Sequence, residues 1–303
     1  MKIAYLILTH VHPDHFHRLV NALTSPLNAC FVHIDKKTNI KDYLNVTNPS
    51  VYFLEDRVKV YRGHYSHVEA ELSLIRHALE HPNGYERLVL LSGTDYPLRS
   101  QEYIAEFFQE NPTVEFMSIT KMPNLSVGKS LSRLYGYNPT PTRPRFYLEI
   151  IIRAILKRLH IIPKTRDYQK ILGDLVPYAG DEWWALTREA CEYIHDFAEK
   201  NSKLLRFYEH TSSPQEMFFQ TILGNSPFME KITRCVTYTD WSGRSGSPAW
   251  ITKDHLKNYK TKMLYADDAF GKGELLFARK FSDESVEVVE KLNQYISEGR
   301  NDK

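Results

Sequence analysis

The stretch "KIAYLILTHVHPDHFHRLVNALTSPLNACFVHID", residues 2–35, decides the fold class of this chain. Its first and last parts, 2–9 and 29–35, are short runs of aliphatic, β-branched and aromatic residues, as in strands that are buried on both faces. Between them, residues 15–25 space their apolar positions as one face of a helix does. A strand, a helix and a second strand in this order predict a parallel βαβ unit.

The same alternation continues to about residue 120 and predicts an α/β fold, with a mostly parallel central sheet flanked by helices on both faces. Ligands bind such sheets at the carboxyl ends of the strands, so "LTH", "HID" and "LSGTDYP" are the places to look for a site. Further strands are expected at 51–56, 87–93 and 114–119, and further helices at 67–82 and 100–111.

The pattern changes after residue 120. Residues 121–147 are rich in Pro, Asn, Ser, Tyr and Arg and predict a long loop or lid, which a basic amphipathic segment at 147–164 follows. After Gly180 the strand and helix patterns resume. We therefore predict a single domain over 1–303 with an inserted loop and basic helix at 121–180.

Composition excludes some classes of protein. Lys plus Arg is 39 and Asp plus Glu is 37, so the net charge of +2 gives no general reason to expect nucleic acid as a partner. The cysteines, Cys30, Cys191 and Cys235, lie far apart in apolar surroundings, as buried thiols in a reducing compartment do. The first apolar run is too short to span a bilayer and lacks a signal cleavage region. We expect a cytoplasmic protein.

The opening stretch also holds "THVHPDHFH", residues 9–17, with four histidines and an aspartate. It resembles the metal-binding loop of metallo-β-lactamase-type hydrolases, in which imidazoles hold zinc and lower the pKa of a bound water. Such a fold places strands ahead of this loop, whereas here the motif arrives at residue 9. The histidines that could complete the site, His64 and His67, lie where a loop runs into a helix. A zinc hydrolase therefore stays an alternative.

From the residues alone, the histidine run also has a structural explanation. His10 ends the first strand, Pro13 begins the helix, and Asp14 is a cap or a first-turn acid. His15 and His17 are then expected on or near the solvent side of the helix.

Eight motifs in sequence order resemble the core-2/I-branching β-1,6-N-acetylglucosaminyltransferase family, glycosyltransferase family 14, which also includes the peptide xylosyltransferases. They are "AYLILTH", "FVHIDKK", "VYRGHYSHVEAEL", "LLSGTDYPLRS", "WWALTRE", "SSPQEMFFQTIL", "YTDW" and "LLFARKF". The resemblance implies a GT-A type nucleotide-sugar transferase fold and an inverting transfer that needs no divalent metal. It assigns nucleotide binding to 1–120 and acceptor binding and catalysis to 181–303.

The residues independently support transfer without a metal, because the sequence contains no Asp-x-Asp pair to hold an ion against the donor diphosphate. Fixed cations can stabilise the departing phosphate charge instead. Lys280 in "FARKF" matches the family's diphosphate-binding lysine, and Lys262 is a looser match to a second family cation. Without the resemblance, "FARKF" is equally typical of an exposed strand with two solvated charges.

The family's catalytic base is the glutamate of its S-P-D-E motif, and Glu216 in "SSPQE" occupies that position with Gln215 replacing the aspartate. The same residues spell a capping box, with Ser213 as the cap and Pro214 at the first helical position. Both roles can coexist, since a helix N-terminus favours the ionised carboxylate that a general base needs.

For the donor, the resemblance implies that Leu8, Thr9 and His10 line the nucleoside, that Asp35 contacts uridine, and that Tyr61 stacks or hydrogen-bonds nearby. Asp35 is equally well explained as a turn residue ahead of two solvated lysines. Asp95 either orients the donor sugar or caps a turn, and the structural role is favoured.

For the acceptor, aromatic rings suit the flat C–H faces of sugars. Trp241 in "YTDW" matches a family tryptophan of the acceptor site. The "DEWW" motif adds Trp183 as a second candidate wall and Asp181 and Glu182 as hydroxyl binders or backup bases.

The sequence thus predicts a UDP-sugar donor, a glycan acceptor that can be lipid-linked, and no metal or other cofactor. The sugar can be N-acetylglucosamine, xylose or another hexose. We expect a bacterial enzyme of surface polysaccharide synthesis that contacts the inner face of the cell membrane through 147–164. The alternative from another class is a non-catalytic sugar- or nucleotide-binding module, which the Gln215 replacement would suit.

Overall fold

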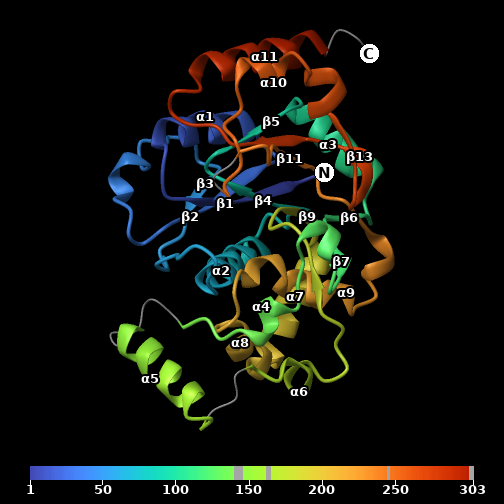
Figure 1. Ribbon diagram of the computed structural model, residues 1–303. Coiled ribbons are helices and arrows are strands. Elements are labelled where there is room, and N and C mark those ends of the chain that lie inside the picture. Colours follow the sequence, from blue (N-terminus) through green and yellow to red (C-terminus); the bar gives the residue numbers. More distant parts are fainter. Residues whose placement is uncertain (140–145, 162–164, 244–245, 300–303) are drawn as a thin grey trace.

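The computed structural model describes residues 1–139, 146–161, 165–243 and 246–299, and Figure 1 shows their arrangement. A seven-stranded sheet with the order β10-β6-β9-β4-β1-β2-β3 forms the centre. Its strands are β1 (Ile3–Thr9), β2 (Ala29–Ile34), β3 (Val51–Phe53), β4 (Arg87–Ser92), β6 (Glu115–Met117), β9 (Trp184–Thr187) and β10 (Ile232–Thr233).

The predicted mostly parallel sheet is confirmed. β1 pairs in parallel with both β2 and β4, so that Thr9 lies opposite Ile34 and Leu8 lies opposite Ser92. The carboxyl ends of these strands therefore meet at one edge. β9 runs antiparallel between β4 and β6, a reversal that its sequence pattern does not reveal.

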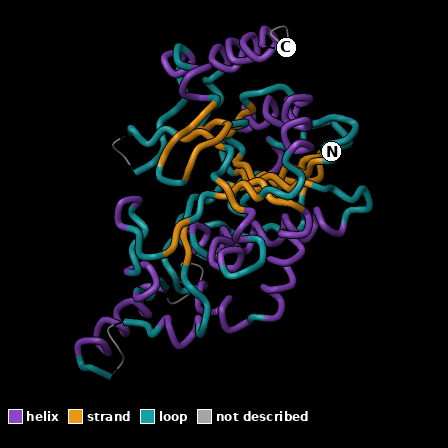
Figure 2. Tube along the Cα trace, turned by 90° about the vertical axis from the view of Figure 1, so that its right-hand side faces the viewer, coloured by secondary structure: helices purple, strands orange, loops and turns teal. Residues whose placement is uncertain are grey.

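Two layers of helices cover the sheet, as the ribbon and the turned tube both show (Figures 1 and 2). Alternate residues of β1 enter different cores: Ala4 and Leu6 pack on one side, and Tyr5 and Ile7 on the other. The helices of the first side include α2 (Ser66–Glu80), α6 (Tyr168–Leu172), α7 (Arg188–Lys200), α8 (Ser202–Tyr208) and α9 (Phe218–Gly224), and those of the second are α1 (Pro13–Leu23), α3 (Gln101–Glu110), α10 (Lys253–Leu256) and α11 (Val286–Gly299).

Three smaller sheets complete the fold. One joins β5 (Asp95–Pro97), β14 (Phe277–Arg279) and β11 (Thr237–Thr239), and its β5–β14 register sets Asp95 opposite Arg279. The others are the pairs β12 (Tyr265–Asp268) with β13 (Gly271–Glu274), and β7 (Thr120–Lys121) with β8 (Tyr178–Ala179).

The insertion at 121–180 is more regular than its composition indicates. The predicted long loop contains a 3-10 turn at Leu125–Val127 and the short helix α4 (Ser132–Tyr135). The basic segment forms the helix α5 (Phe146–Arg158), whereas Lys164 lies outside the described residues. Across the described residues, the helices fall short of the length and apolar character that crossing a bilayer requires.

The histidine run begins α1 as expected, with Pro13 in the first turn, but the placement of His15 was predicted wrongly. His15 is fully buried, its backbone N–H donates to Asp283 Oδ1 at 2.7 Å, and its ring Nε2 donates to the carbonyl oxygen of Asp95 at 3.0 Å. Burial lowers the pKa of His15 to about 4, so the ring stays neutral. The Phe281 ring, from the far end of the chain, stacks on the His15 ring with the centroids 5.5 Å apart and fills the space that the helical pattern assigned to solvent.

Candidate functional site

A cleft of about 880 Å³ opens between the start of β9, the turn before α9, and the β11 and β12 strands. Polar and aromatic groups from distant parts of the chain face it. Among the sequence-predicted residues, it collects Glu216, Asp181, Glu182, Trp183, Trp241 and Lys262.

Glu216 ends a short 3-10 turn, Pro214–Glu216 (η3), and its side chain points toward two cations of the insertion. Lys129 Nζ donates to Glu216 Oε2 at 2.7 Å, and Arg133 Nη1 donates to the same oxygen at 2.6 Å. The capping box expected from the sequence is wrong, since Ser213 is left-handed at φ 51° and its side chain caps nothing. Sequence reasoning missed both cations, which lie 83 and 87 residues away along the chain.

The turn that carries Glu216 is fixed by a close backbone approach. The Gly180 N–H donates to the Glu216 carbonyl oxygen at 2.9 Å, and Lys129 Nζ also donates to the Gly180 carbonyl oxygen at 2.6 Å. A Cβ on residue 180 would lie 1.6 Å from the Ser118 carbonyl oxygen, so only glycine fits. The resumption of structure after Gly180 therefore coincides with the assembly of the site.

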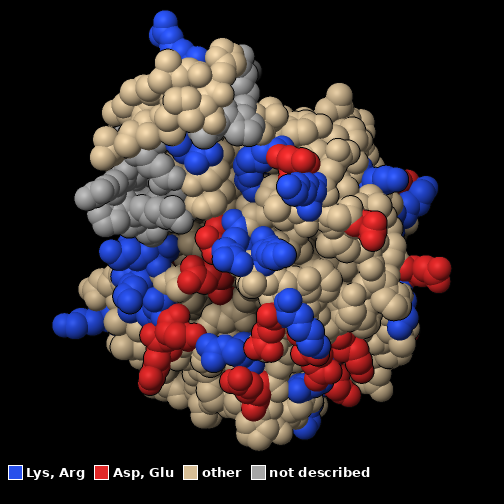
Figure 3. Space-filling view, turned by 90° about the horizontal axis from the view of Figure 1, so that it is seen from below, with Lys and Arg blue, Asp and Glu red and all other residues tan. Residues whose placement is uncertain are grey.

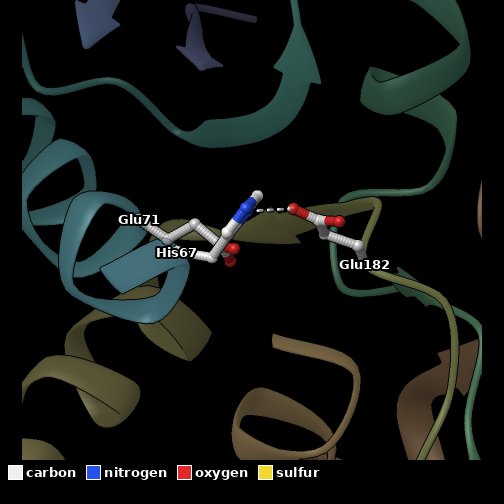
Figure 4. A group of neighbouring side chains, drawn as sticks. All are labelled: His67, Glu71 and Glu182. Atoms are coloured by element: carbon white, nitrogen blue, oxygen red, sulfur yellow. Dashed lines mark hydrogen bonds and ion pairs between the residues drawn. The ribbon is translucent and has the colours of Figure 1, made fainter. Parts of the chain in front are cut away.

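A second acid of the cleft, Glu182, lies against the helix α2. Its Oε1 is 3.1 Å from His67 Nδ1, and Glu71 reaches the same spot from the next turn of α2 (Figure 4). Burial by itself raises the pKa of Glu182, but His67 and Arg279 hold it below its usual range. Burial and the charge of Glu182 raise the pKa of Glu71 well above its usual range, although the Trp184 indole opposes this.

Among the described residues, His67, Glu71 and Glu182 are the one group of three metal-ligating side chains whose ligand atoms lie within 4.8 Å of one another. His67 pairs with Glu182, whereas neither carboxyl oxygen of the fully buried Glu71 has a hydrogen-bond partner among the described residues. The zinc alternative at 9–17 finds no such ligand set within the described residues.

Asp95 forms an ion pair with Arg279, a residue to which the sequence analysis assigned no role. Arg279 Nε is 3.1 Å from Asp95 Oδ1, and the guanidinium lies 4.0 Å from the centre of the Trp183 ring. Asp95 is fully buried and also accepts the N–H and the O–H of Ser92, at 3.0 and 2.5 Å. Burial raises the pKa of Asp95 and Arg279 opposes the rise. Its favoured structural role therefore includes holding Arg279 at the cleft.

The strand-end residues meet at the carboxyl edge of the sheet, as expected. The Asp35 N–H donates to the Thr9 carbonyl oxygen at 2.9 Å, and Asp35 Oδ1 accepts the Lys37 N–H at 2.9 Å, which is the turn role. Lys37 Nζ lies 4.3 Å from the centre of the Tyr61 ring. Leu8 is half-buried and His10 is exposed beside Thr9. Contact of this group with uridine stays a prediction.

Lys280 lies apart from the lining of the cleft, near the loop that follows β11. Its Nζ donates to Ser247 Oγ at 2.8 Å and lies 4.3 Å from the centre of the Trp250 ring. Arg62 reaches the same loop, where it donates to the Gly246 carbonyl oxygen at 2.7 Å. Burial lowers the pKa of Lys280, and the positive charges of Arg279 and Arg62 lower it further. Only Lys280 was identified from the sequence.

The remaining predicted residues differ in how accessible they are. Trp241 is 62% exposed and offers its ring to the cleft, whereas Trp183 is 6% exposed and Arg279 covers one of its faces. Burial raises the pKa of Asp181 and the charge of Lys129 opposes this. An acceptor wall therefore fits Trp241 better than Trp183.

The fold and the cleft define an α/β protein with its candidate site beside the carboxyl edge of a mostly parallel sheet, where acids, cations and an exposed tryptophan gather. The sequence profile described as "Core-2/I-Branching enzyme" matches residues 3–264. The chain belongs to this family.

Similar proteins include xylosyltransferase 2 of Rattus norvegicus, 26% identical over 259 residues, which are 81% of this chain and 27% of the relative. Xylosyltransferase 1 of the same organism is 24% identical over 263 residues, or 81% of this chain and 29% of the relative. The chain thus spans little more than a quarter of the length of these relatives. A structure described as a glucose-1-phosphate thymidylyltransferase of Bacillus anthracis aligns over 66% of this chain and 78% of its own, with 11% identity and a TM-score of 0.29, too low to support an argument.

Glu71→Gln tests the buried carboxyl of the His67 group. Because the folded-state pKa of Glu71 is raised, its protonation supports the fold below the ordinary pKa of 4.5, and this support is lost as pH rises through the folded-state pKa. We expect the variant to match the unaltered chain at low pH and to gain on the order of 1 kcal/mol in the free energy of unfolding near pH 8. Urea denaturation across pH measures this, with the exposed Glu80→Gln on the same helix as control. A gain independent of pH would contradict the assignment.

Arg279→Leu tests the pair that holds the guanidinium at the cleft. Asp95 would lose its cation while staying buried, so the free energy of unfolding should fall by about 3 kcal/mol. Adding Asp95→Asn to Arg279→Leu should recover much of the lost free energy of unfolding. Lys280→Leu leaves no buried acid unpaired, so it should lower the free energy of unfolding far less. Urea denaturation of the unaltered chain, the two single variants and the double variant measures these differences. Equal losses of unfolding free energy in Arg279→Leu and in the double variant would show that the ion pair is not the cause.

Proposed function

We propose that the chain is a glycosyltransferase that moves a sugar from a UDP-sugar to a hydroxyl of an acceptor glycan, with inversion and without a divalent metal. The family supports a sugar-transfer function. The observation that carries the finer proposal is the placement of Glu216, which two cations hold by one oxygen inside the same cleft as the exposed Trp241.

In this mechanism Glu216 is the general base. Lys129 and Arg133 both bind Oε2, and no described residue donates to Oε1, so Oε1 is the oxygen that takes the proton of the acceptor hydroxyl. The acceptor oxygen attacks the anomeric carbon from the face opposite UDP. The bond from that carbon to the phosphate oxygen breaks, and UDP leaves with the electron pair. Attack from the opposite face inverts the anomeric centre.

Fixed cations take the part of a metal in this proposal. Lys280 and Arg62 gather at the loop after β11, and Lys262 lines the cleft, so developing diphosphate charge would meet positive groups that no described carboxylate neutralises. Leu8, Thr9, His10, Asp35 and Tyr61 would bind the nucleoside at the adjacent strand ends, while Trp241, Asp181 and Glu182 would contact the acceptor.

The setting is part of the same proposal. We infer a cytoplasmic enzyme of bacterial surface polysaccharide synthesis, with a lipid-linked acceptor and peripheral contact to the inner face of the membrane through 147–164. The exposed apolar residues of α5 support the membrane contact.

Glu216→Gln tests the base. Removing the proton acceptor should lower the rate of sugar transfer by roughly 100- to 10,000-fold, because that is the usual contribution of a general base. Binding of UDP should stay unchanged. Release of UDP from UDP-N-acetylglucosamine, UDP-xylose and UDP-glucose, with and without glycan acceptors, measures the rate, and Glu230→Gln at an exposed position is the control. A variant as active as the unaltered chain would exclude Glu216 as the base, whereas an unaltered chain that binds UDP-sugars and releases no UDP would favour a binding module.

Thermal unfolding with UDP tests the replacement of the metal by cations. We expect UDP to raise the melting temperature equally with and without a chelator, because bound ligand stabilises the folded state whatever holds its phosphates. Lys280→Ala should reduce the shift, and Lys200→Ala on the exposed end of α7 should not. Loss of the shift on adding chelator would overturn the metal-free proposal.

A further inference from the structure

Helix α5 exposes an apolar stripe that nothing in the described chain covers. In Figure 1 it stands at the edge of the molecule, apart from the central sheet and its helices. Leu148, Ile151, Ile152 and Ile155 recur at helical spacing on one face of α5, and Leu159 continues the row just past its end. These five side chains are between 45% and 61% exposed. A stripe of this size costs free energy in water and marks a contact surface.

A basic pocket of about 580 Å³ lies beside this helix, between α5, α6 and α8. Its wall contains five arginine and lysine side chains and one acid, Asp167. The five are Arg153, Arg166, Lys170, Lys203 and Arg206. The pocket therefore carries a strong local excess of positive charge on a chain whose net charge is only +2.

Most of these five cationic groups make few or no hydrogen bonds or ion pairs with the described residues. Arg166 donates to the carbonyl oxygens of Gly136, Phe207 and His210 and is structural. By contrast, the ammonium groups of Lys170 and Lys203 form no hydrogen bond or ion pair with a described residue. Arg206 makes only a long bond, of 3.4 Å, to the Ser202 carbonyl oxygen. These groups match a ligand with several anionic oxygens, and a phosphate is the common one.

The stripe and the pocket share α5, since Arg153 of the pocket wall belongs to the same helix. A ligand that fits both has an anionic phosphate joined to hydrocarbon. We propose that α5 and the basic pocket form one docking surface for a membrane of anionic phospholipid, with the stripe in the acyl boundary and a headgroup phosphate in the pocket. The proposal rests on the membrane contact of the proposed function and adds the lipid class and the residues that select it.

The charge distribution favours a membrane over a second copy of the chain. A two-fold contact through α5 would bring two such basic pockets toward each other, and like charges would repel. In Figure 3 the protruding part at the upper left is mostly uncharged on the face in view, with a few blue side chains and no red ones.

The docking surface is also joined to the candidate active site. The Arg166 N–H donates to the Tyr135 carbonyl oxygen at 2.9 Å, at the end of α4, and Arg133 of α4 binds Glu216. A membrane bound at α5 would therefore lie close along the chain to the residues that hold the base. A lipid-linked acceptor would then be concentrated on the side of the protein that carries the insertion.

Co-sedimentation of the full chain with phosphatidylcholine vesicles, with and without phosphatidylglycerol, tests the docking surface. We expect binding to the anionic vesicles and little to the neutral ones. The charge-reversal pair Lys170→Glu and Lys203→Glu should weaken anionic binding about tenfold or more, because each basic residue near the surface contributes about 1 kcal/mol. The pair Ile151→Asp and Ile155→Asp should abolish it. Leu125→Asp, at a residue 74% exposed elsewhere, combined with Lys200→Glu is a control double variant away from this surface.

Two vesicle results would overturn the proposal: no binding to anionic vesicles, or anionic binding that the double lysine variant leaves unchanged. A dimer in sedimentation equilibrium that the double isoleucine variant dissociates would also overturn it, because the stripe would then contact a second copy. The UDP thermal shift of each variant separates this from the proposed function. Variants that keep the UDP thermal shift but no longer bind vesicles leave the proposed transferase site intact. If UDP gives no thermal shift in the unaltered chain, the result counts against the transferase and not against the docking surface.

Discussion

Burial of β1 and β2 on both faces is the constraint from which the rest of the structure follows. Neither strand can place a charged side chain along its length without desolvating it, so the polar groups of this region collect where the strands end. Thr9 and Asp35 are such groups, and the parallel register brings them together. The antiparallel β9 starts at the same edge, directly after the cleft acids Asp181 and Glu182. One burial requirement therefore positions residues from both halves of the chain.

The electrostatics of the site follow from how its acids are paired. Glu216, Glu182 and Asp95 each have a basic partner, and the last two are mostly or fully buried, where an unpaired carboxylate would be costly. The pairing leaves a surplus of positive charge. Within the described residues, the cations without an ion pair in or beside the cleft are Arg62, Lys262 and Lys280. Of the acids that line the cleft, Asp181 alone has no ion-pair partner among the described residues, and burial raises its pKa. A dianionic leaving group would therefore meet few unpaired carboxylates.

Sequence patterns sufficed where the determining contacts are local, and failed where they are distant. The strands and helices up to residue 120 were predictable because burial imposes a period on each segment by itself. The burial of His15 was not, because Asp283 and Phe281 come from the far end of the chain. Glu216 was identified through its motif, but its partners Lys129 and Arg133 sit in a segment whose composition indicates only a loop. Arg279 was overlooked because a strand that alternates charged and aromatic residues is equally typical of a solvated surface.

The insertion changes how the chain divides into functional parts. Its composition suggests a loop, and the family resemblance places that loop between a nucleotide-binding half and a catalytic half, yet it supplies both cations that fix Glu216. Arg166, further along the same insertion, ties the end of α4 to α8 through the carbonyl oxygens of Gly136 and Phe207. The site around Glu216 is therefore built from two segments of the chain. One provides the carboxylate, and the insertion orients it. The insertion also carries the exposed apolar helix α5.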